Sequence, residues 1–244
     1  MSLEKIPQHV ALIMDGNGRW AGRQGLARIR GHQAGADRLE DVMRAAEKAG
    51  VKYITLYAFS KENWHRPKDE VQFLMQLLSN YLDHKLAELK KNNIVFNAIG
   101  CLTDMPSEIQ AKLSRAAEET ASNTGLFVTF AFSYSSRLEI TEACRALARL
   151  AVQGKIDPEM ISEKDVASHL YTSALPDPDL LIRTSGEMRV SNFLLWQISY
   201  AELYVTEKCW PEFTAEEFQK ALAAYSLRER RFGRTEPLNT GADA

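Results

Sequence analysis

The sequence predicts an α/β fold, a single domain with a central parallel β-sheet flanked by helices. Short runs rich in β-branched and aromatic residues alternate along the chain with longer helical patterns. Two of the short runs, residues 10–14 and 127–132, are apolar almost throughout, which is typical of strands buried on both faces of a sheet. No linker, low-complexity tract or internal repeat interrupts the pattern, so we expect one domain over residues 1–244 with flexible ends.

The elements follow in a regular order. We expect strands at residues 9–14, 53–59, 95–99, 126–132 and 179–182 because Val, Ile, Tyr and Phe concentrate there. Helices are expected at residues 33–49, 67–91, 106–122, 136–152 and 162–171, which have longer patterns of helical period. Strands separated by helices of this length favour parallel pairing, since parallel neighbours need a long crossover connection.

The helix expected after Pro67 has two apolar faces. One stripe contains Val71, Leu74, Met75, Leu78, Leu82, Leu86 and Leu89, and a second contains Phe73, Leu77 and Tyr81. By pattern alone, packing between the sheet and another helix or subunit is the favoured interpretation. The alternative is that this helix forms the wall of an apolar pocket, which would need an apolar ligand.

Composition excludes several classes of protein. The net charge is −2 and the pI about 6.2, so nothing global attracts the chain to nucleic acid or to an anionic membrane surface. Cys101, Cys144 and Cys209 are odd in number and far apart, which argues against a disulfide framework or a zinc site and favours a reducing cytoplasm. No signal-peptide stretch and no apolar run of about 18 residues is present, so we expect any lipid to be handled from outside the bilayer.

The first expected strand runs directly into Asp15, Gly16, Asn17, Gly18 and Arg19. Ligands of open α/β sheets bind at the carboxyl ends of strands, where loops diverge and a following helix offers free N–H groups. Glycines let the backbone approach an oxyanion, Asn and Arg add donors, and an Asp binds a divalent cation, a combination that suits a diphosphate with Mg²⁺. The loop matches neither a P-loop nor a dinucleotide fingerprint, and as a bare pattern it is more often only a turn.

The same chemistry recurs after other expected strands. Donors for oxyanions follow the first loop, the second strand and the last strand; they include Arg23, Arg28, Arg30 and His32, then Ser60, Asn63 and Arg66, then Arg183, Arg189, Ser191 and Asn192. A lone Arg is usually a solvated surface residue. Because the carboxyl ends of parallel strands converge in space, this repetition predicts a site for two phosphorylated groups.

Four segments carry a resemblance to a known family: residues 9–21 (HVALIMDGNGRWA), 57–67 (YAFSKENWHRP), 183–187 (RTSGE) and 191–197 (SNFLLWQ). They resemble the signature segments of the undecaprenyl diphosphate synthase family of cis-prenyltransferases, over about residues 9–235. The resemblance implies a homodimer, Mg²⁺ dependence, a hydrophobic tunnel for the prenyl chain, and cis condensation of isopentenyl diphosphate onto an allylic prenyl diphosphate. The implied primer is farnesyl diphosphate and the default product undecaprenyl diphosphate, a lipid carrier for cell-wall synthesis; peripheral membrane contact is a further hypothesis.

The resemblance also implies roles for individual residues. Asp15 would act in catalysis and place Mg²⁺, Glu202 would be a second carboxylate of the metal site, and Asn63 is implicated in proton removal. The implied substrate-binding residues are Gly16, Asn17, Gly18, Arg19, Trp20, Arg28, His32, Ser60, Glu62, Trp64 and Arg66, together with Arg183, Arg189 and Ser191 for isopentenyl diphosphate. Arg231 and Gly233 match a motif that reaches the isopentenyl site of the other subunit.

Two departures from the family pattern stand out. Residues 133–137 read Ser-Tyr-Ser-Ser-Arg where many members have Asn-Tyr-Gly-Gly-Arg, and Met188 stands where His or Gln is usual. Neither removes Asp15 or the phosphate-binding arginines, so activity is still expected. Three alternatives stay open: a shorter-chain cis-prenyl diphosphate synthase, a noncatalytic subunit of the same fold, and an unrelated phosphate-binding α/β enzyme.

Overall fold

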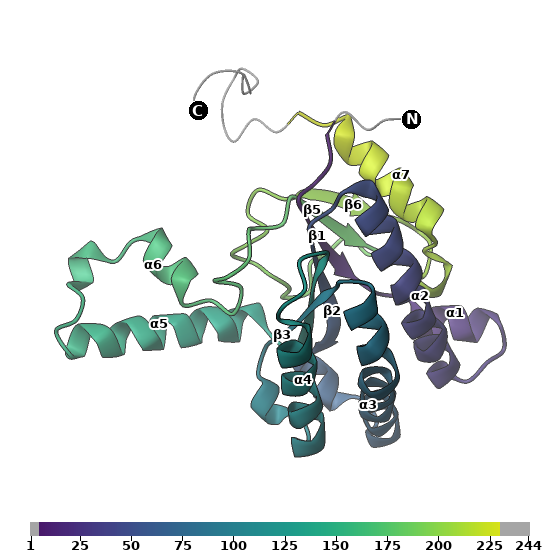
Figure 1. Ribbon diagram of the computed structural model, residues 1–244, viewed down its shortest axis with the longest axis horizontal. Helices are drawn as coiled ribbons and strands as arrows, with labels where there is room; N and C mark the ends of the chain where they lie inside the picture. The colour runs from purple at the N-terminus through teal and green to yellow at the C-terminus, as the bar shows by residue number, and fades with distance from the viewer. Residues whose placement is uncertain (1–4, 230–244) are drawn as a thin grey trace.

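The computed structural model of the chain describes residues 5–229, which form one six-stranded sheet of the order β3-β4-β2-β1-β5-β6 with every pair of neighbours parallel (Figure 1). The strands are β1 (His9–Ile13), β2 (Tyr53–Ser60), β3 (Val95–Ile99), β4 (Phe127–Tyr134), β5 (Leu180–Arg183) and β6 (Glu202–Val205). All of β1 and β5 is buried, as the apolar runs require of central parallel strands. The predicted fold class is confirmed.

The helices are α1 (Asn17–Arg23), α2 (Arg28–Ala49), α3 (Lys68–Lys91), α4 (Ser107–Thr120), α5 (Ser136–Val152), α6 (Glu163–Ser168) and α7 (Ala215–Ser226). Short 3₁₀ turns lie at η1 (Lys61–His65), η2 (Leu102–Asp104), η3 (Pro158–Met160) and η4 (Trp210–Glu212). Sequence patterns do not predict α1, β6 or α7, and they start α2 five residues late. Gly31 lies in this first part of α2 and weakens its helical sequence pattern. Packing requires a glycine there, since a Cβ at this position would lie 2.0 Å from the carbonyl oxygen of Asn17.

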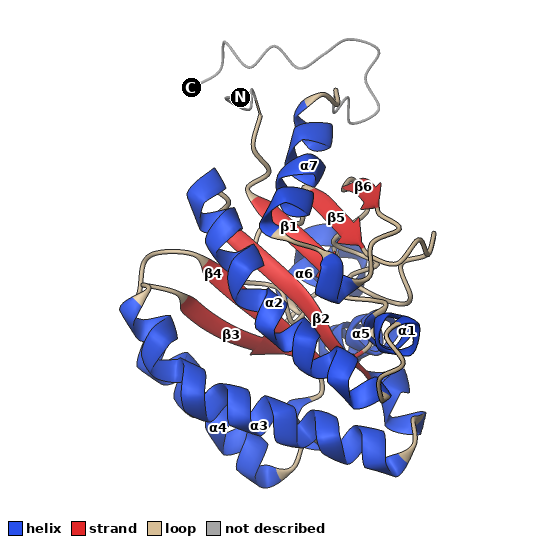
Figure 2. Ribbon diagram, turned by 90° about the vertical axis from the view of Figure 1, so that its right-hand side faces the viewer, coloured by secondary structure: helices blue, strands red, loops and turns tan. Residues whose placement is uncertain are grey.

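The two faces of the sheet are covered differently. Helices α2, α3, α4 and α7 pack on one face and bury the larger apolar core with β1, β2 and β4 (Figure 2). The other face carries a smaller cluster, in which Phe193 and Leu194 come from the irregular segment between β5 and β6. Helices α5 and α6 extend away from the sheet (Figure 1). None of the helices among residues 5–229 is both long enough and apolar enough to cross a bilayer.

The connections place a switch point at the centre of the sheet. β1 pairs with β2 on one side and with β5 on the other, and the chain leaves β1 toward β2 but leaves β5 toward β6. The loops after β1 and β5 therefore diverge above the carboxyl ends of two neighbouring strands. Such a crevice is where open α/β sheets bind ligands, and Ile13 and Arg183 are register partners at its base.

Burial of His9 makes the stability of the fold depend on pH. The ring is 1% exposed, lies 2.6 Å from the carbonyl oxygen of Pro176 through Nδ1 and accepts from the Thr55 hydroxyl through Nε2, and burial lowers its pKa from 6.5 to about 4. Between these two pH values the His9 ring binds a proton in the unfolded chain but stays neutral in the folded chain. We expect the free energy of unfolding to fall by about 3 kcal/mol between pH 6.5 and 4 from this group alone.

Urea unfolding at a series of pH values measures this contribution. In a His9→Gln variant, which keeps one donor and one acceptor, the slope of unfolding free energy against pH should flatten in that window. Identical slopes for the variant and the unchanged protein would contradict the assignment.

Candidate active site

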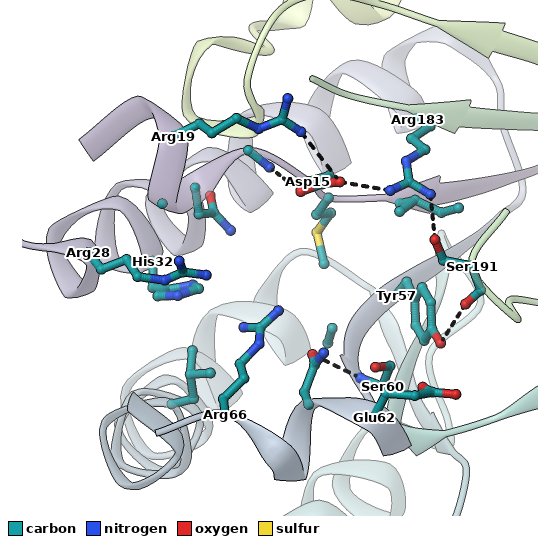
Figure 3. Close-up of a pocket in the computed structure, with 18 of the residues that line it drawn as sticks. Asp15, Arg19, Arg28, His32, Tyr57, Ser60, Glu62, Arg66, Arg183 and Ser191 are labelled. Carbon is teal, nitrogen blue, oxygen red and sulfur yellow. Dashed lines mark hydrogen bonds and ion pairs between the residues drawn. The ribbon is translucent and has the colours of Figure 1, made fainter. Parts of the chain in front are cut away.

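A cavity of about 720 Å³ opens above the switch point, at the carboxyl edge of the sheet (Figure 3). Four parts of the chain surround it: the loop after β1, the first turns of α2, the η1 turn after β2, and the segment that follows β5. It is lined by Ile13, Met14, Asp15, Gly16, Asn17, Gly18, Arg19, Arg28, His32, Tyr57, Ala58, Ser60, Glu62, Asn63, Arg66, Leu74, Arg183, Ser191 and Asn192. The cavity is cationic on opposite walls, with Arg19 and Arg183 above and Arg28 and Arg66 below.

The loop after β1 is fixed through its backbone. The Thr184 hydroxyl lies 2.9 Å from the backbone nitrogen of Asp15 and 2.7 Å from its carbonyl oxygen, which ties this loop to the end of β5. Gly16 has a φ of 97°, and a Cβ there would lie 2.8 Å from the Cβ of Ser185 and 2.9 Å from the Sγ of Cys209. Only glycine fits this turn, and the turn places the Asp15 carboxylate at the cavity.

Arg183 is the most buried arginine lining the cavity, since its side chain is 6% exposed and is bonded on two sides. Its guanidinium donates to Asp15 Oδ2 at 2.8 Å and to Ser191 Oγ at 2.8 Å. Its Nε is buried and has no hydrogen-bond partner among residues 5–229. Asp15 and Ser191 thus fix the Arg183 guanidinium at the cavity, where charged donors of this kind bind oxyanions well.

The opposite wall is organised by a buried carboxylate. Glu70, in the first turn of α3, is 8% exposed at its side chain and lies 3.1 Å from Arg28 Nε, 3.2 Å from His32 Nε2 and 3.1 Å from Arg66 NH1. Burial lowers the pKa of His32, and the Glu70 carboxylate opposes that shift. One anion therefore gathers three donors from α2 and from the turn before α3 at the edge of the cavity.

The third wall is the η1 turn. Asn63 Oδ1 accepts from the backbone N–H of Ser60 at 3.2 Å, which closes the turn and leaves the Asn63 NH₂ group at the cavity. Asn192 donates to the Glu62 carboxylate at 2.9 Å, so η1 is joined to the segment after β5. Burial opposes ionisation of Glu62, yet the hydrogen bond from Asn192 brings its pKa below the usual value.

An apolar cavity of about 120 Å³ continues from the cationic one. The two share Met14, Asn17, His32, Tyr57, Ala58 and Leu74. Helix α3 forms one wall through Leu74, Met75, Leu77, Leu78 and Tyr81, and the aromatic rings of Phe130 and Phe132 close the far side from β4. The second apolar stripe predicted on this helix therefore does contribute to a pocket, through Leu77 and Tyr81.

The structure brings most of the predicted site residues together. Around the cationic cavity lie Asp15, Gly16, Asn17, Gly18, Arg19, Arg28, His32, Ser60, Glu62, Asn63, Arg66, Arg183 and Ser191. Trp20 and Trp64 line neither cavity. Trp64 instead packs edge-on against Phe59, 4.9 Å between ring centroids, and donates to the Ser133 hydroxyl. Arg231 and Gly233 lie outside the described residues.

The structure places two other predicted site residues, Arg189 and Glu202, with their side chains outside the cationic cavity. The Arg189 side chain pairs with Glu187 and is 58% exposed, and only its carbonyl oxygen contacts the site, by accepting from Arg183 at 2.5 Å. Glu202 is the first residue of β6 and Arg183 the last of β5, so Glu202 lies at the amino edge of the sheet, where it pairs with Arg228 at 2.6 Å. Asp15 lies at the carboxyl edge, so the two carboxylates form no metal site within one chain.

Two residues that organise the walls of the candidate site escaped the sequence analysis. Glu70 reads as an ordinary acidic residue in a first helical turn, although its spacing of four from Arg66 is a usable signal. Tyr57 reads as a strand residue, but its ring stacks on Phe193 at 4.3 Å and its hydroxyl donates to the carbonyl oxygen of Ser191 at 3.2 Å. That contact is between segments 134 residues apart, which no local pattern predicts.

The residues that line the cationic cavity fit a divalent cation that would bind together with a diphosphate substrate. Mg²⁺ usually binds through one or two carboxylates plus phosphate oxygens and water. Asp15 supplies one carboxylate at the cavity, beside arginines that would hold phosphates. Among residues 5–229 no three His, Cys, Asp or Glu side chains gather into a self-sufficient metal cage, which fits a cation that would be completed by diphosphate oxygens and water.

Fold and site together define a class: an α/β enzyme that binds phosphorylated groups at a switch point, beside an apolar cavity. Comparison with known proteins identifies the family. Residues 13–233 match the family described as "Putative undecaprenyl diphosphate synthase". An isoprenyl transferase of Heliobacterium mobile is 48% identical over 94% of this chain and 88% of its own length, and one of Geobacter sulfurreducens is 49% identical over 95% and 94%. The chain belongs to this family of prenyltransferases, as its motifs indicate.

A solved structure supports the same assignment. Lavandulyl diphosphate synthase from Lavandula x intermedia, in complex with dimethylallyl diphosphate, superposes with a TM-score of 0.92 and is 37% identical in sequence. The match covers 94% of this chain and 99% of that one. The chain is therefore a transferase of isoprenoid biosynthesis.

Proposed function

We propose that this chain condenses isopentenyl diphosphate with an allylic prenyl diphosphate, most simply farnesyl diphosphate, and forms a new cis double bond at each addition. The observation that carries the proposal is the continuity of the two cavities. A cationic space lined by arginines opens directly into an apolar space along α3. A molecule with a diphosphate head and a hydrocarbon tail matches both.

The chemistry requires stabilisation of a leaving anion. The allylic C–O bond breaks, and its electron pair leaves with the diphosphate, which gains charge in the transition state. Donors already aimed at that position favour the transition state over the ground state. Arg19, Arg28 and Arg66 are such donors, and each is held in place by a carboxylate before any substrate binds.

The second substrate supplies the new carbon–carbon bond. The C=C of isopentenyl diphosphate attacks the allylic carbon, and a proton leaves the carbon next to the new bond, so that a double bond forms again. Arg183 and Ser191 would bind its diphosphate, since they lie together on the β5 side of the cavity. Asn63 would orient the proton that leaves, with the departing diphosphate as the base.

Mg²⁺, which we propose as the cofactor, would be held by Asp15 with diphosphate oxygens. When bound, it would neutralise negative charge on the leaving group. Asp15 pairs with Arg183 at 2.8 Å, so the same carboxylate would hold the cation and orient the guanidinium that would bind the diphosphate of the second substrate.

The test is incubation with farnesyl diphosphate, labelled isopentenyl diphosphate and Mg²⁺, followed by extraction of lipid product. We expect labelled, organic-soluble polyprenyl diphosphate. Binding of both substrates without any product would instead support a noncatalytic subunit of the same fold.

Size of the apolar cavity favours a second candidate, a shorter-chain synthase. A volume of 120 Å³ admits about ten water-sized groups, the size of two isoprene units. An undecaprenyl chain has several times as many carbons, more than the cavity holds at this volume. The lavender relative named above is a diphosphate synthase of the same fold. Mass analysis of the extracted product separates the two candidates.

Filling the apolar cavity should shorten the product. Leu78 is half-buried on α3 and faces the cavity. A Leu78→Trp variant is expected to give products with fewer isoprene units and little change in the rate of the first addition, because the diphosphate site is untouched. Leu86→Trp is the matched control, since Leu86 lies on the same helix but faces a surface groove beside α4. Unchanged product length in Leu78→Trp would show that the chain grows elsewhere.

We also propose that the active form is a homodimer that contacts membranes peripherally. The edge strand β6 and the loop before it expose Leu203 (50%) and Tyr200 (67%), and α5–α6 stands away from the sheet. Analytical ultracentrifugation tests the dimer. The insolubility of the product motivates the membrane contact, which flotation with liposomes tests.

A further inference from the structure

The η1 turn is anchored at three of its five residues. Glu62 is bonded by Asn192, Lys61 donates to Asp104 Oδ2 at 2.7 Å, and Trp64 Nε1 donates to Ser133 Oγ at 2.9 Å. The three anchors lie on different elements. Asn63, between them, is left to line the cavity.

Two of these anchors converge on one carboxylate. The Ser133 hydroxyl accepts from Trp64 and donates in turn to Asp104 Oδ2, the same oxygen that accepts from Lys61. Asp104 ends η2 and does not line the cavity. The first and fourth residues of η1 are therefore both linked to this one carboxylate, Lys61 directly and Trp64 through Ser133.

Ser133 is specialised for this link. It is fully buried and has a φ of 44°, a left-handed conformation that costs a non-glycine residue about 1 kcal/mol or more. Its hydroxyl is the group that passes the hydrogen bond from the indole to the carboxylate. Ser133 is also one of the positions at which the sequence departs from the family pattern, so this form of the link belongs to this chain.

We propose that Asp104 and Ser133 are positioning residues that fix η1 and so set where Asn63 lies relative to the reacting carbon atoms. The inference rests on the proposed function. The Lys61–Asp104 pair is 41% and 32% exposed at its two side chains, and such pairs contribute little to global stability. Their effect is therefore expected in the geometry of the turn, and displacement of a reacting group by about 1 Å costs up to about a hundred-fold in rate.

The experiment compares Asp104→Ala, Ser133→Ala and the double variant. We expect each single variant to lower kcat about tenfold to a hundred-fold, and the double variant to match the worse single one, because all three break the same link. Equilibrium binding of the allylic diphosphate should change less than about threefold, since Arg19, Arg28 and His32 lie on other elements and Arg66, which follows η1, is held separately by Glu70 at 3.1 Å.

The matched control is Asp83→Ala, which breaks a Lys–Asp pair of the same 2.7 Å length between α3 and α4 and should leave kcat unchanged. Hydrogen exchange without substrate should show the amides of residues 61–66 exchanging about tenfold faster in both single variants. Full kcat in both single variants would overturn the proposal. So would a loss of kcat in the double variant equal to the product of the two single losses, or an unchanged exchange rate of the amides of residues 61–66. Failure of the unaltered chain to make product would reject the proposed function, while the exchange result would still decide whether the link holds the turn.

Discussion

An Asp15→Asn variant is expected to lose about a thousand-fold or more in kcat of isoprenyl transfer. The change keeps the side chain's shape and an acceptor for the Gly16 N–H, which now bonds Asp15 Oδ1 at 2.7 Å. It removes the negative charge that would bind Mg²⁺ and that pairs with Arg183 at 2.8 Å. Loss of rate with a retained fold would therefore report the charge and not the packing.

Steady-state kinetics with both substrates, at several Mg²⁺ concentrations, measures this effect. The apparent Mg²⁺ requirement should rise together with the loss of kcat. Asp41→Asn is the control, because Asp41 pairs with Arg38 on the surface of α2, away from both cavities. Full activity of Asp15→Asn would reject the proposed metal site and the proposed mechanism with it.

Arg183→Lys is expected to raise the KM for isopentenyl diphosphate by about a hundred-fold. Lysine keeps the charge but loses the planar fork that bonds Asp15, Ser191 and the Arg189 carbonyl oxygen simultaneously. The side chain is buried, so each partner that lysine does not reach loses a hydrogen bond that water does not readily replace, and this loss costs free energy. The KM for the allylic substrate should change much less, because the donors proposed for that substrate lie on α1 and α2 and in the segment before α3.

Arg115→Lys provides the comparison for this substitution. Arg115 is exposed on α4 and pairs with Glu119 at 2.6 Å, so both KM values should stay as they are. Equal increases in both KM values for Arg183→Lys would mean that Arg183 holds the whole site together and does not select one substrate.

The strands and the first-loop chemistry were predictable because they depend on local pattern. A buried parallel strand needs a continuous apolar run, and residues 10–14 and 127–132 have one. The alternation of strand and helix then implies that strand ends meet at one edge, which is enough to predict that Asp15, Arg28 and Arg183 lie near one another.

What escaped prediction depends on register and on tertiary contacts. Glu202 belongs to a motif near the other site residues in sequence, but β6 runs parallel to β5, and its first residue therefore lies at the wrong edge. Trp64 and Ser133 are 69 residues apart, and their hydrogen bond turns the indole away from the cavity. The seven-residue α1 is too short to show a helical period.

The pairing of β1 with β5 also bears on how the protein is made. Asp15 and Arg183 are 168 residues apart, so the ribosome has synthesised three quarters of the chain before the second can reach the first. Until then one edge of β1 stays unpaired. All of its residues except His9 are apolar, and an unpaired strand of this kind promotes aggregation. Long-range parallel pairing of this sort folds slowly. We therefore expect newly made chains to expose this edge for longer than the early strands alone would suggest, and to complete the candidate site only when β5 pairs with β1.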